Sequence, residues 1–413
     1  MAALTASEKG ISVALLEEHR EVGVPSHCSG HVGISGFRKF GPPVPKAIIE
    51  NEIKGAVLFS PGGRELLIHK PSAVTWVLNR AELDRHLANL ATNRGAELHL
   101  GSRVESLKRD EDGFLLNISG SNKRAISCRM LIDASGCSSS ISRYAGLSHS
   151  KMDMLVNSAQ FNVENLSNVD SDFVEVYFGQ RYAPGFFGWI IPRRDGTAKV
   201  GIAARAPANV RECFKRFVTK HPIASPKLRH TRTLAPTVYH PIPIGGASNR
   251  TFADSILVVG DAASQVKPTT GGGIVFGLAC GRIAGETAAK AIESRKTSDN
   301  EIASYETRWR KLLGFDLKAM TWLRRLLYNL PDPELDSIFR VSQELKADQV
   351  LNRTSDIDFQ GRTLFSLARD PRLLITFLSA SFLSAPSLLA PRAGNYREPR
   401  DDFPETCSRQ PNY

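Results

Sequence analysis

Cysteine is scarce and scattered in this 413-residue sequence. The six cysteines stand at positions 28, 128, 137, 213, 280 and 407, and no two of them form a CxxC pair. Disulfide frameworks and structural zinc sites need cysteines at closer, regular spacings. The spacing therefore excludes a disulfide-stapled secreted scaffold, and it predicts a cytoplasmic location and no metal site.

Long apolar runs are also missing. Residues 1–10 are small and polar and lack the apolar core of a signal peptide. The most apolar late segment, residues 373–390, is interrupted by four serines and one proline, so it does not predict a spanning helix. Two interpretations of this segment stay open: a packed core helix, and an amphipathic segment lying on a membrane surface.

Acidic residues are outnumbered, with 42 Asp and Glu against 53 Lys and Arg, which gives a formal net charge of +11. This excess suits an anionic ligand such as a pyrophosphate or a phospholipid headgroup, but also an anionic membrane or nucleic acid. Charge alone does not choose among these partners. The length and the 42% hydrophobic content are sufficient for two or three globular domains.

No GxGxxG sequence occurs anywhere in the chain. The N-terminus nevertheless has the pattern of the second half of a dinucleotide-binding βαβ unit. Residues 2–9 predict the end of a helix, Gly10 ends it, and residues 11–16 predict a buried parallel strand. Glu17 follows, where such a unit carries the acid that binds the adenosine ribose. The glycine loop that holds the pyrophosphate is expected upstream of Met1.

Residues 256–286, ILVVGDAASQVKPTTGGGIVFGLACGRIAGE, predict a strand, a ligand-facing loop and a helix N-terminus. Asp261, at the strand end, can accept hydrogen bonds from the hydroxyls of a ribityl chain. Gly271, Gly272 and Gly273 allow backbone N–H groups at the positive end of a helix to lie against a flat ring. The segment therefore predicts the flavin end of an FAD site, with a purely structural turn as the alternative.

The rest of the pattern divides the chain into domains. Residues 80–91 predict an amphipathic helix, residues 104–132 a hairpin or meander, and residues 156–204 an antiparallel sheet with a hairpin through Arg194, Asp195 and Gly196. We predict five segments. They are the first part of an FAD-binding domain (1–150), an inserted antiparallel substrate-binding domain (151–243), the second part of the FAD-binding domain (244–300), a helical region (301–391) and a disordered tail (392–413).

Taken together these features resemble the geranylgeranyl reductase family of FAD-dependent oxidoreductases. Glu17, six residues before Gly23, stands at the family's ribose-binding acid, and residues 25–30, PSHCSG, resemble its flavin-proximal segment with a signature cysteine. Asn79 and Arg80 with Leu83 and Asp84 resemble the start of the helix whose arginine contacts FAD. The sequence GDAASQVKPTTGGG is close to the family's second flavin motif.

The resemblance implies an α/β fold, α+β overall, in which a Rossmann-like FAD-binding domain of the para-hydroxybenzoate hydroxylase type carries an inserted antiparallel-sheet domain and a helical C-terminus. It implies that FAD is bound by Glu17, Arg80, Val104, Gly260, Asp261, Pro268, Gly271, Gly272 and Gly273. It makes Cys28 the candidate catalytic residue, as a proton donor or a flavin-side gate. An ordinary thiol has a pKa near ~8.5 and is mostly protonated at neutral pH. A small buried hydrophobe is the alternative role.

The family's substrate signature, P-x-x-Y-x-W-x-F-P, has a modified counterpart here. Its positions are Pro184, Phe187, Trp189, Ile191 and Pro192, with Phe187 in place of the tyrosine and Ile191 in place of the phenylalanine. The hydroxyl is lost, but the apolar character that a polyprenyl chain needs is kept. A second departure is Ser135 in the sequence Ala-Ser-Gly, where the superfamily often has aspartate.

The leading hypothesis is an FAD-dependent reductase that saturates the C=C bonds of geranylgeranyl chains in isoprenoid, archaeal-type membrane lipids or their precursors. It implies a polyprenyl lipid substrate, an external electron donor such as ferredoxin, NADPH or another reduced carrier, peripheral contact with the cytoplasmic face of the membrane, and no nucleic acid. A flavin monooxygenase or halogenase on the same fold is one alternative. A truncated, non-catalytic lipid-binding remnant is the other, because the pyrophosphate loop is absent.

Overall fold

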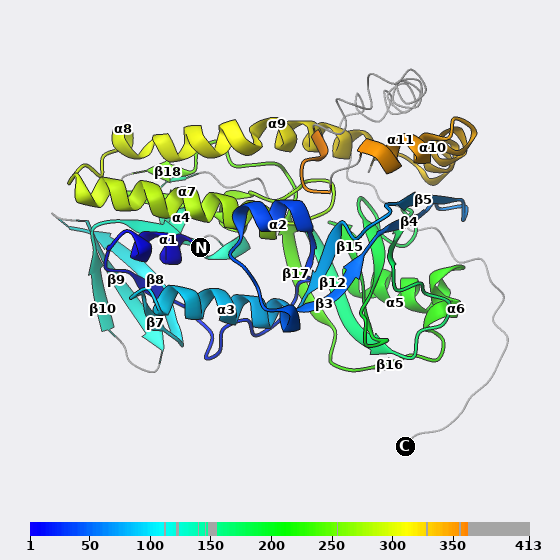
Figure 1. The fold of residues 1–413 in the computed structure, drawn as a ribbon, viewed down its shortest axis with the longest axis horizontal. Helices are drawn as coiled ribbons and strands as arrows, with labels where there is room; N and C mark the ends of the chain where they lie inside the picture. Colours follow the sequence, from blue (N-terminus) through cyan, green and yellow to red (C-terminus); the bar gives the residue numbers. More distant parts are fainter. Residues whose placement is uncertain are drawn as a thin grey trace.

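The computed structural model describes residues 1–361 except 111–112, 121–123, 139, 145, 148–154, 254, 328 and 355–356. Long helices and short parallel strands form one end of the molecule, and a large sheet forms the other (Figure 1). The apolar segment 373–390 and the tail 392–413 lie outside the described residues. No described helix is both long and apolar enough to cross a membrane.

The central helix of the first end is α7 (Ile274–Glu293), in which 13 of 20 residues are buried. Helix α1 (Ala2–Glu8) crosses α7 closely because Gly285 has no side chain, and a Cβ there would lie 2.6 Å from the carbonyl oxygen of Ala2. Helix α9 (Ser304–Leu327) lies along α7 on the outer side (Figure 1). Tyr305 and Trp309 anchor it, since both are fully buried and the Tyr305 hydroxyl donates to the carbonyl oxygen of Val258 over 2.6 Å.

The predicted elements of the FAD-binding part are confirmed. Strand β1 (Ala14–Leu16) pairs in parallel with β7 (Glu97–His99), although it begins at Ala14 rather than at residue 11. Helix α3 (Arg80–Thr92) begins at Arg80 because the Asn79 side chain caps it by accepting the Glu82 N–H over 3.2 Å. The predicted meander consists of β8 (Ser102–Arg109), β9 (Phe114–Gly120) and β10 (Arg124–Cys128). Strand β11 (Leu131–Asp133) pairs in parallel with β19 (Ile256–Val258).

The large sheet has eight strands and is mainly antiparallel. Its order is β16 (Arg232–Thr233), β12 (Leu155–Glu164), β15 (Ala198–Arg205), β14 (Phe187–Pro192), β13 (Phe173–Phe178), β4 (Gly55–Phe59) and β5 (Glu65–His69), with β17 (Val238–Pro243) also beside β12. The predicted hairpin of β14 and β15 is confirmed.

The large sheet extends beyond the predicted segment 151–243, because it also contains β4 and β5. They come from residues 1–150, which the sequence pattern assigns to the FAD-binding part, yet β4 pairs in parallel with β13. Gly55 allows β5 to approach, since a Cβ there would lie 1.8 Å from the carbonyl oxygen of Ile68. The pairing joins segments more than 100 residues apart, and the apolar pattern of a strand does not specify such a partner.

Smaller elements complete the described fold. A three-stranded antiparallel sheet contains β2 (His31–Gly33), β6 (Thr75–Leu78) and β3 (Ile49–Ile53). The remaining elements are η1 (Lys46–Ile48), α2 (Ile34–Phe40), η2 (Gly136–Ser138), α4 (Ser140–Tyr144), α5 (Val210–Lys220), α6 (Ala224–Leu228), β18 (Phe252–Ala253), η4 (Gly260–Ala263), α8 (Asp299–Ile302), α10 (Asp332–Glu344) and α11 (Ala347–Thr354).

Protonation of His221 is expected to destabilise the fold. His221 ends α5, and its Nδ1 accepts the N–H groups of Ile223 (3.2 Å) and Ala224 (3.1 Å). Burial lowers its pKa to about 4. Because the unfolded chain takes up this proton near pH ~6.5, stability is full above that pH and falls toward pH 4, by roughly 2 kcal/mol between pH 7 and pH 5.

Urea unfolding at several pH values measures the slope of the unfolding free energy against pH. In a His221→Asn variant, the amide oxygen retains an acceptor that does not titrate, so the slope should be smaller. An unchanged slope in that variant would assign the pH dependence to other groups.

Candidate active site

A cavity of about 2770 Å³ borders both ends of the molecule. It extends from α1 and β1, past the loop between η4 and α7, to the apolar faces of β13, β14 and α10. A cavity for one drug-sized ligand measures about 300–1,000 Å³. The space therefore suits a large cofactor together with a second, apolar molecule.

Most of the predicted site residues line this cavity. They are Glu17, Cys28, Arg80, Val104, Gly260, Asp261, Gly271, Gly272 and Gly273 from the predicted catalytic and cofactor sets, and Phe187, Trp189 and Ile191 from the substrate set. Ser135 also lines it. Pro184, Pro192 and Pro268 do not: they stand in the same segments, and Pro192 and Pro268 are buried. The cavity thus joins residues from segments that are far apart in the sequence.

The glycine loop before α7, residues 271–273, lines the cavity at a helix N-terminus. Gly271 has a φ of +72°, which favours glycine, and a Cβ on Gly272 would lie 2.7 Å from Cε of Lys267. Gly273 is the N-cap of α7, and no side chain caps the helix there. Uncapped N–H groups at the positive end of a 20-residue helix favour an anionic or polar ligand edge.

Arg80 lies beside the Cys28 segment. Its Nη2 donates to both carboxylate oxygens of Asp84 at 3.0 Å, and its buried Nε has no hydrogen-bond partner within the described chain. Burial opposes the charged form of Arg80, but the Cys28 sulfur and the Asp84 carboxylate raise its pKa above the ordinary value. A half-buried guanidinium with a buried, unused Nε donor fits a polar or anionic cofactor group.

Lys199 holds the Cys28 segment in place. Its side chain is buried, and Nζ donates to the carbonyl oxygens of Ser29 (2.9 Å) and Leu78 (3.2 Å) and to Oε2 of Glu50 (2.8 Å). Burial lowers the pKa of Lys199, and the Glu50 carboxylate opposes this shift. The ammonium group therefore ties the residue after Cys28 to the residue at the end of β6.

The Lys199 contacts were missed at the sequence level. The only signal was one lysine in the apolar run AKVGIAA on a predicted strand. A buried cation in a sheet needs a partner on another element. The sequence pattern did not reveal that partner.

Replacing Lys199 with methionine is expected to reduce the free energy of unfolding by about 2 kcal/mol, because one buried and one half-buried carbonyl group lose their donor. Glu50 keeps an ion pair with Arg193, whose Nε lies 3.2 Å away, and this limits the loss. Urea unfolding measures the change, and alkylation of Cys28 should become faster. Lys215→Met on the exposed face of α5 is the control and should differ little from the parent. Equal stability and equal labelling in Lys199→Met would contradict the anchoring role.

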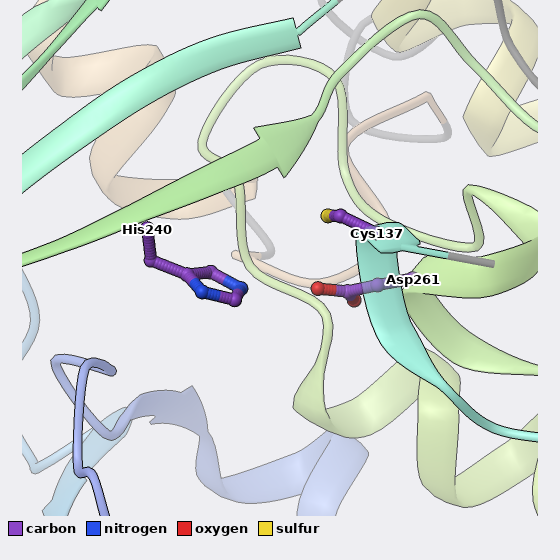
Figure 2. A group of neighbouring side chains, drawn as sticks. All are labelled: Cys137, His240 and Asp261. Carbon is purple, nitrogen blue, oxygen red and sulfur yellow. The ribbon is translucent and has the colours of Figure 1, made fainter. Parts of the chain in front are cut away.

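Asp261 lies beside two further polar side chains, Cys137 and His240 (Figure 2). One potential ligand atom from each lies within 4.8 Å of the other two, although the sequence predicted no metal site. Burial raises the pKa of Asp261, and Arg80 opposes this. Burial and the Asp261 charge raise the pKa of Cys137 to about 12, and its thiol donates to the carbonyl oxygen of Pro241 over 3.2 Å. These groups border the predicted flavin contacts.

The apolar end of the cavity is formed by alternate residues of β14. Phe187, Trp189 and Ile191 belong to one apolar cluster, whereas Ile190 points into the cluster on the other face, beneath α5. Phe186 stacks on Phe187 with ring centroids 4.3 Å apart. The Trp189 indole N–H donates to Oε1 of Gln160 over 3.1 Å, so the ring presents an apolar surface while its polar atom is satisfied.

The C-terminal helices supply the other apolar wall, which the sequence did not predict. Leu323 and Leu327 of α9 and Leu335, Ile338 and Phe339 of α10 line the cavity. Their helical apolar periodicity was visible, but it does not say which surface a helix covers.

A third feature that the sequence did not predict connects the loop between η4 and α7 to residues after α11. Nζ of Lys267 lies 2.9 Å from Oδ1 of Asp358, and both side chains are almost completely buried.

Comparison with known proteins identifies the family. The family model described as "FAD binding domain" matches residues 1–307. The digeranylgeranylglycerophospholipid reductase 2 of Methanothermobacter thermautotrophicus is 35% identical over 347 residues, covering 82% of this chain and 87% of the relative. This chain belongs to the digeranylgeranylglycerophospholipid reductase family. The relative of that name from Methanocaldococcus jannaschii is 32% identical over 342 residues, covering 82% of this chain and 86% of the relative.

Solved structures agree with this reductase family in fold. A geranylgeranyl bacteriochlorophyll reductase-like protein from Thermoplasma acidophilum has a TM-score of 0.81 at 24% identity, covering 92% of this chain and 95% of that chain. A flavin-dependent brominase, Bmp2, has a TM-score of 0.66 at 14% identity, covering 87% of this chain and 90% of that chain. The predicted fold class, the FAD cofactor and the assignment to flavin-dependent oxidoreductases are confirmed.

Proposed function

We propose that this protein is an FAD-dependent reductase that saturates the C=C bonds of geranylgeranyl chains in isoprenoid membrane lipids or their precursors. One observation carries the proposal. The same cavity contains the glycine loop with Asp261, the Cys28 thiol and the apolar residues Phe187 and Trp189. The relatives at 32% and 35% identity have the corresponding name.

The cofactor end fits FAD. The uncapped start of α7 and the unused Nε of Arg80 are donors for polar groups of the cofactor, and Asp261 is an acceptor for hydroxyls. Glu17 lies at the end of β1, where an adenosine ribose would be bound. When reduced, FAD supplies the hydride that an unpolarised alkene requires.

The other residues act on the lipid and on the proton. Phe187, Trp189 and Ile191 of β14, together with Phe339 of α10, exclude water and hold a polyprenyl chain by apolar contact. The Cys28 thiol supplies the proton for the second alkene carbon, so that one hydride and one proton add across each double bond. An external reduced carrier such as ferredoxin or NADPH restores the two electrons. Because the substrate is a membrane lipid, we include peripheral contact with a membrane in the proposal.

Anaerobic turnover tests the proposal. The protein is loaded with FAD, its flavin content is measured, and it is incubated with a geranylgeranyl glycerophospholipid and excess dithionite. Mass spectrometry should show the addition of two hydrogens for each double bond. A protein that holds FAD but leaves every double bond intact would overturn the reductase assignment. A protein that retains no FAD would favour the alternative of a truncated, non-catalytic lipid-binding remnant. Halogenation or hydroxylation of an aromatic compound in air with reduced flavin would favour the monooxygenase or halogenase class.

A further inference from the structure

Helix α9 exposes two large aromatic side chains on one face. Phe315 is 57% exposed and Trp322 is 54% exposed, which places them among the three most exposed large hydrophobic residues of the described chain. They are seven residues apart, so they lie on the same side of the helix. Exposed aromatic residues on one stripe are uncommon on a surface that faces only water.

The same face is basic. The exposed residues of α9 from position 307 onward are Thr307, Arg308, Lys311, Phe315, Lys318, Trp322 and Arg325. None of these is acidic: Asp316 is buried and Glu306 is half-buried and paired with Arg310. Arg308 pairs with Glu286, whereas Lys311, Lys318 and Arg325 form no ion pair within the described part of the chain. We call these seven residues the α9 face.

The opposite side of α9 borders the apolar cavity. Leu323 and Leu327, one residue and five residues after Trp322, line it. In Figure 1, α9 runs along the outer edge of the molecule, with α7 on its inner side. Helix α9 therefore borders the apolar end of the cavity on one side and presents the α9 face on the other.

We propose that the α9 face docks on the surface of an anionic lipid bilayer. Phe315 and Trp322 insert at the boundary between headgroups and acyl chains, and Lys311, Lys318 and Arg325 contact anionic headgroups. Aromatic residues flanked by cations are typical of helices that lie in this interface. The choice of partner rests on the proposed function, because the cavity that would hold a lipid substrate borders the other side of the same helix. A second copy of this chain is the rival occupant.

Tryptophan fluorescence gives a direct test. Of the four tryptophans, Trp76, Trp189 and Trp309 are buried and Trp322 is exposed. Vesicles of phosphatidylcholine with increasing phosphatidylglycerol are added to the full-length holoprotein. We expect the emission to shift to the blue, quenching by lipids brominated on the acyl chain, and co-sedimentation that weakens as salt increases.

Two variants separate the apolar and ionic contributions. Phe315→Ser/Trp322→Ser should reduce the vesicle-bound fraction about tenfold, since binding scales with the apolar area inserted. Leu100→Ser/Leu234→Ser, at two other exposed apolar positions, is the matched control and should bind like the parent. Lys311→Glu/Lys318→Glu should remove the dependence on phosphatidylglycerol, whereas Lys215→Glu/Lys220→Glu on α5 should retain it.

Equal vesicle binding by the parent and by Phe315→Ser/Trp322→Ser would overturn the proposal. A parent that ignores vesicles but forms a dimer, which the same double variant dissociates in sedimentation, would assign the face to a second copy. Activity on detergent-dispersed lipid, which needs no vesicle binding, tests the proposed function separately from the docking of the α9 face. The double variant should retain that activity, and a parent that binds vesicles but never reduces the lipid would overturn the function alone.

Discussion

Replacing Cys28 with alanine is expected to slow saturation of a geranylgeranyl lipid by roughly 10²- to 10⁴-fold, the usual contribution of a positioned proton donor. FAD should stay bound, because the cofactor contacts of the α7 start and Arg80 do not need the thiol. Cys28 borders the cavity and lies near Arg80. Its sulfur accepts a hydrogen bond from the Gly30 N–H, with 3.4 Å between nitrogen and sulfur. Anaerobic turnover and the flavin absorbance spectrum measure the two quantities separately.

A second cysteine provides the control for this prediction. Cys213 is buried on α5 among the residues under the large sheet and does not line the cavity. Cys213→Ala should keep its turnover even if it loses some stability. If Cys28→Ala reduces the lipid at the parent rate, another group donates the proton, and Cys28, which is half-buried, has only a packing role.

Replacing Lys267 with methionine is expected to lower the free energy of unfolding by about 3–5 kcal/mol, because a buried carboxylate loses its cation. The side chains of Lys267 and Asp358 are 5% and 2% exposed, and Nζ also donates to the carbonyl oxygen of Ile357 over 3.1 Å. Lys267 belongs to the loop that ends at the start of α7, since its carbonyl accepts the Gly271 N–H over 2.9 Å. FAD retention should therefore fall together with stability.

A double variant distinguishes the loss of an ion pair from the loss of packing. Lys267→Met/Asp358→Leu removes both charges and should recover part of the stability lost in the single variant. Urea unfolding of the two single variants, the double variant and the parent gives the coupling energy. Additive losses would show that the two side chains do not stabilise each other, and the proposed link between the flavin loop and residues 357–361 would be wrong.

Elements that depend on neighbouring residues were predicted from the sequence. The helix from Arg80 was predicted, and the structure adds its Asn79 cap, which accepts an N–H group three residues away. The predicted end of α1 at Gly10 has a φ of +76°. The alternation of Phe187, Trp189 and Ile191 on one face of β14 follows from the two-residue period of a strand. The requirement for glycine before α7 is also local, because a positive φ at Gly271 and a close approach at Gly272 leave no room for another residue.

Motifs also predicted the cofactor and the family, and the comparisons confirm both. The roles of Cys28, Glu17 and Pro184 stay predictions. The structure shows only whether each lines the cavity, and Pro184 does not.

By itself the sequence determined the helix and strand periods, and it predicted the flavin segment and the apolar substrate signature, because these are patterns among residues close along the chain. Only the tertiary structure decided which distant segments meet. It paired β4 with β13, placed Lys199 under the Cys28 segment and brought Asp358 to Lys267. These contacts depend on how apolar faces pack and on how buried charges find partners across 90 to 170 residues. Local spacing carries no information about such partners.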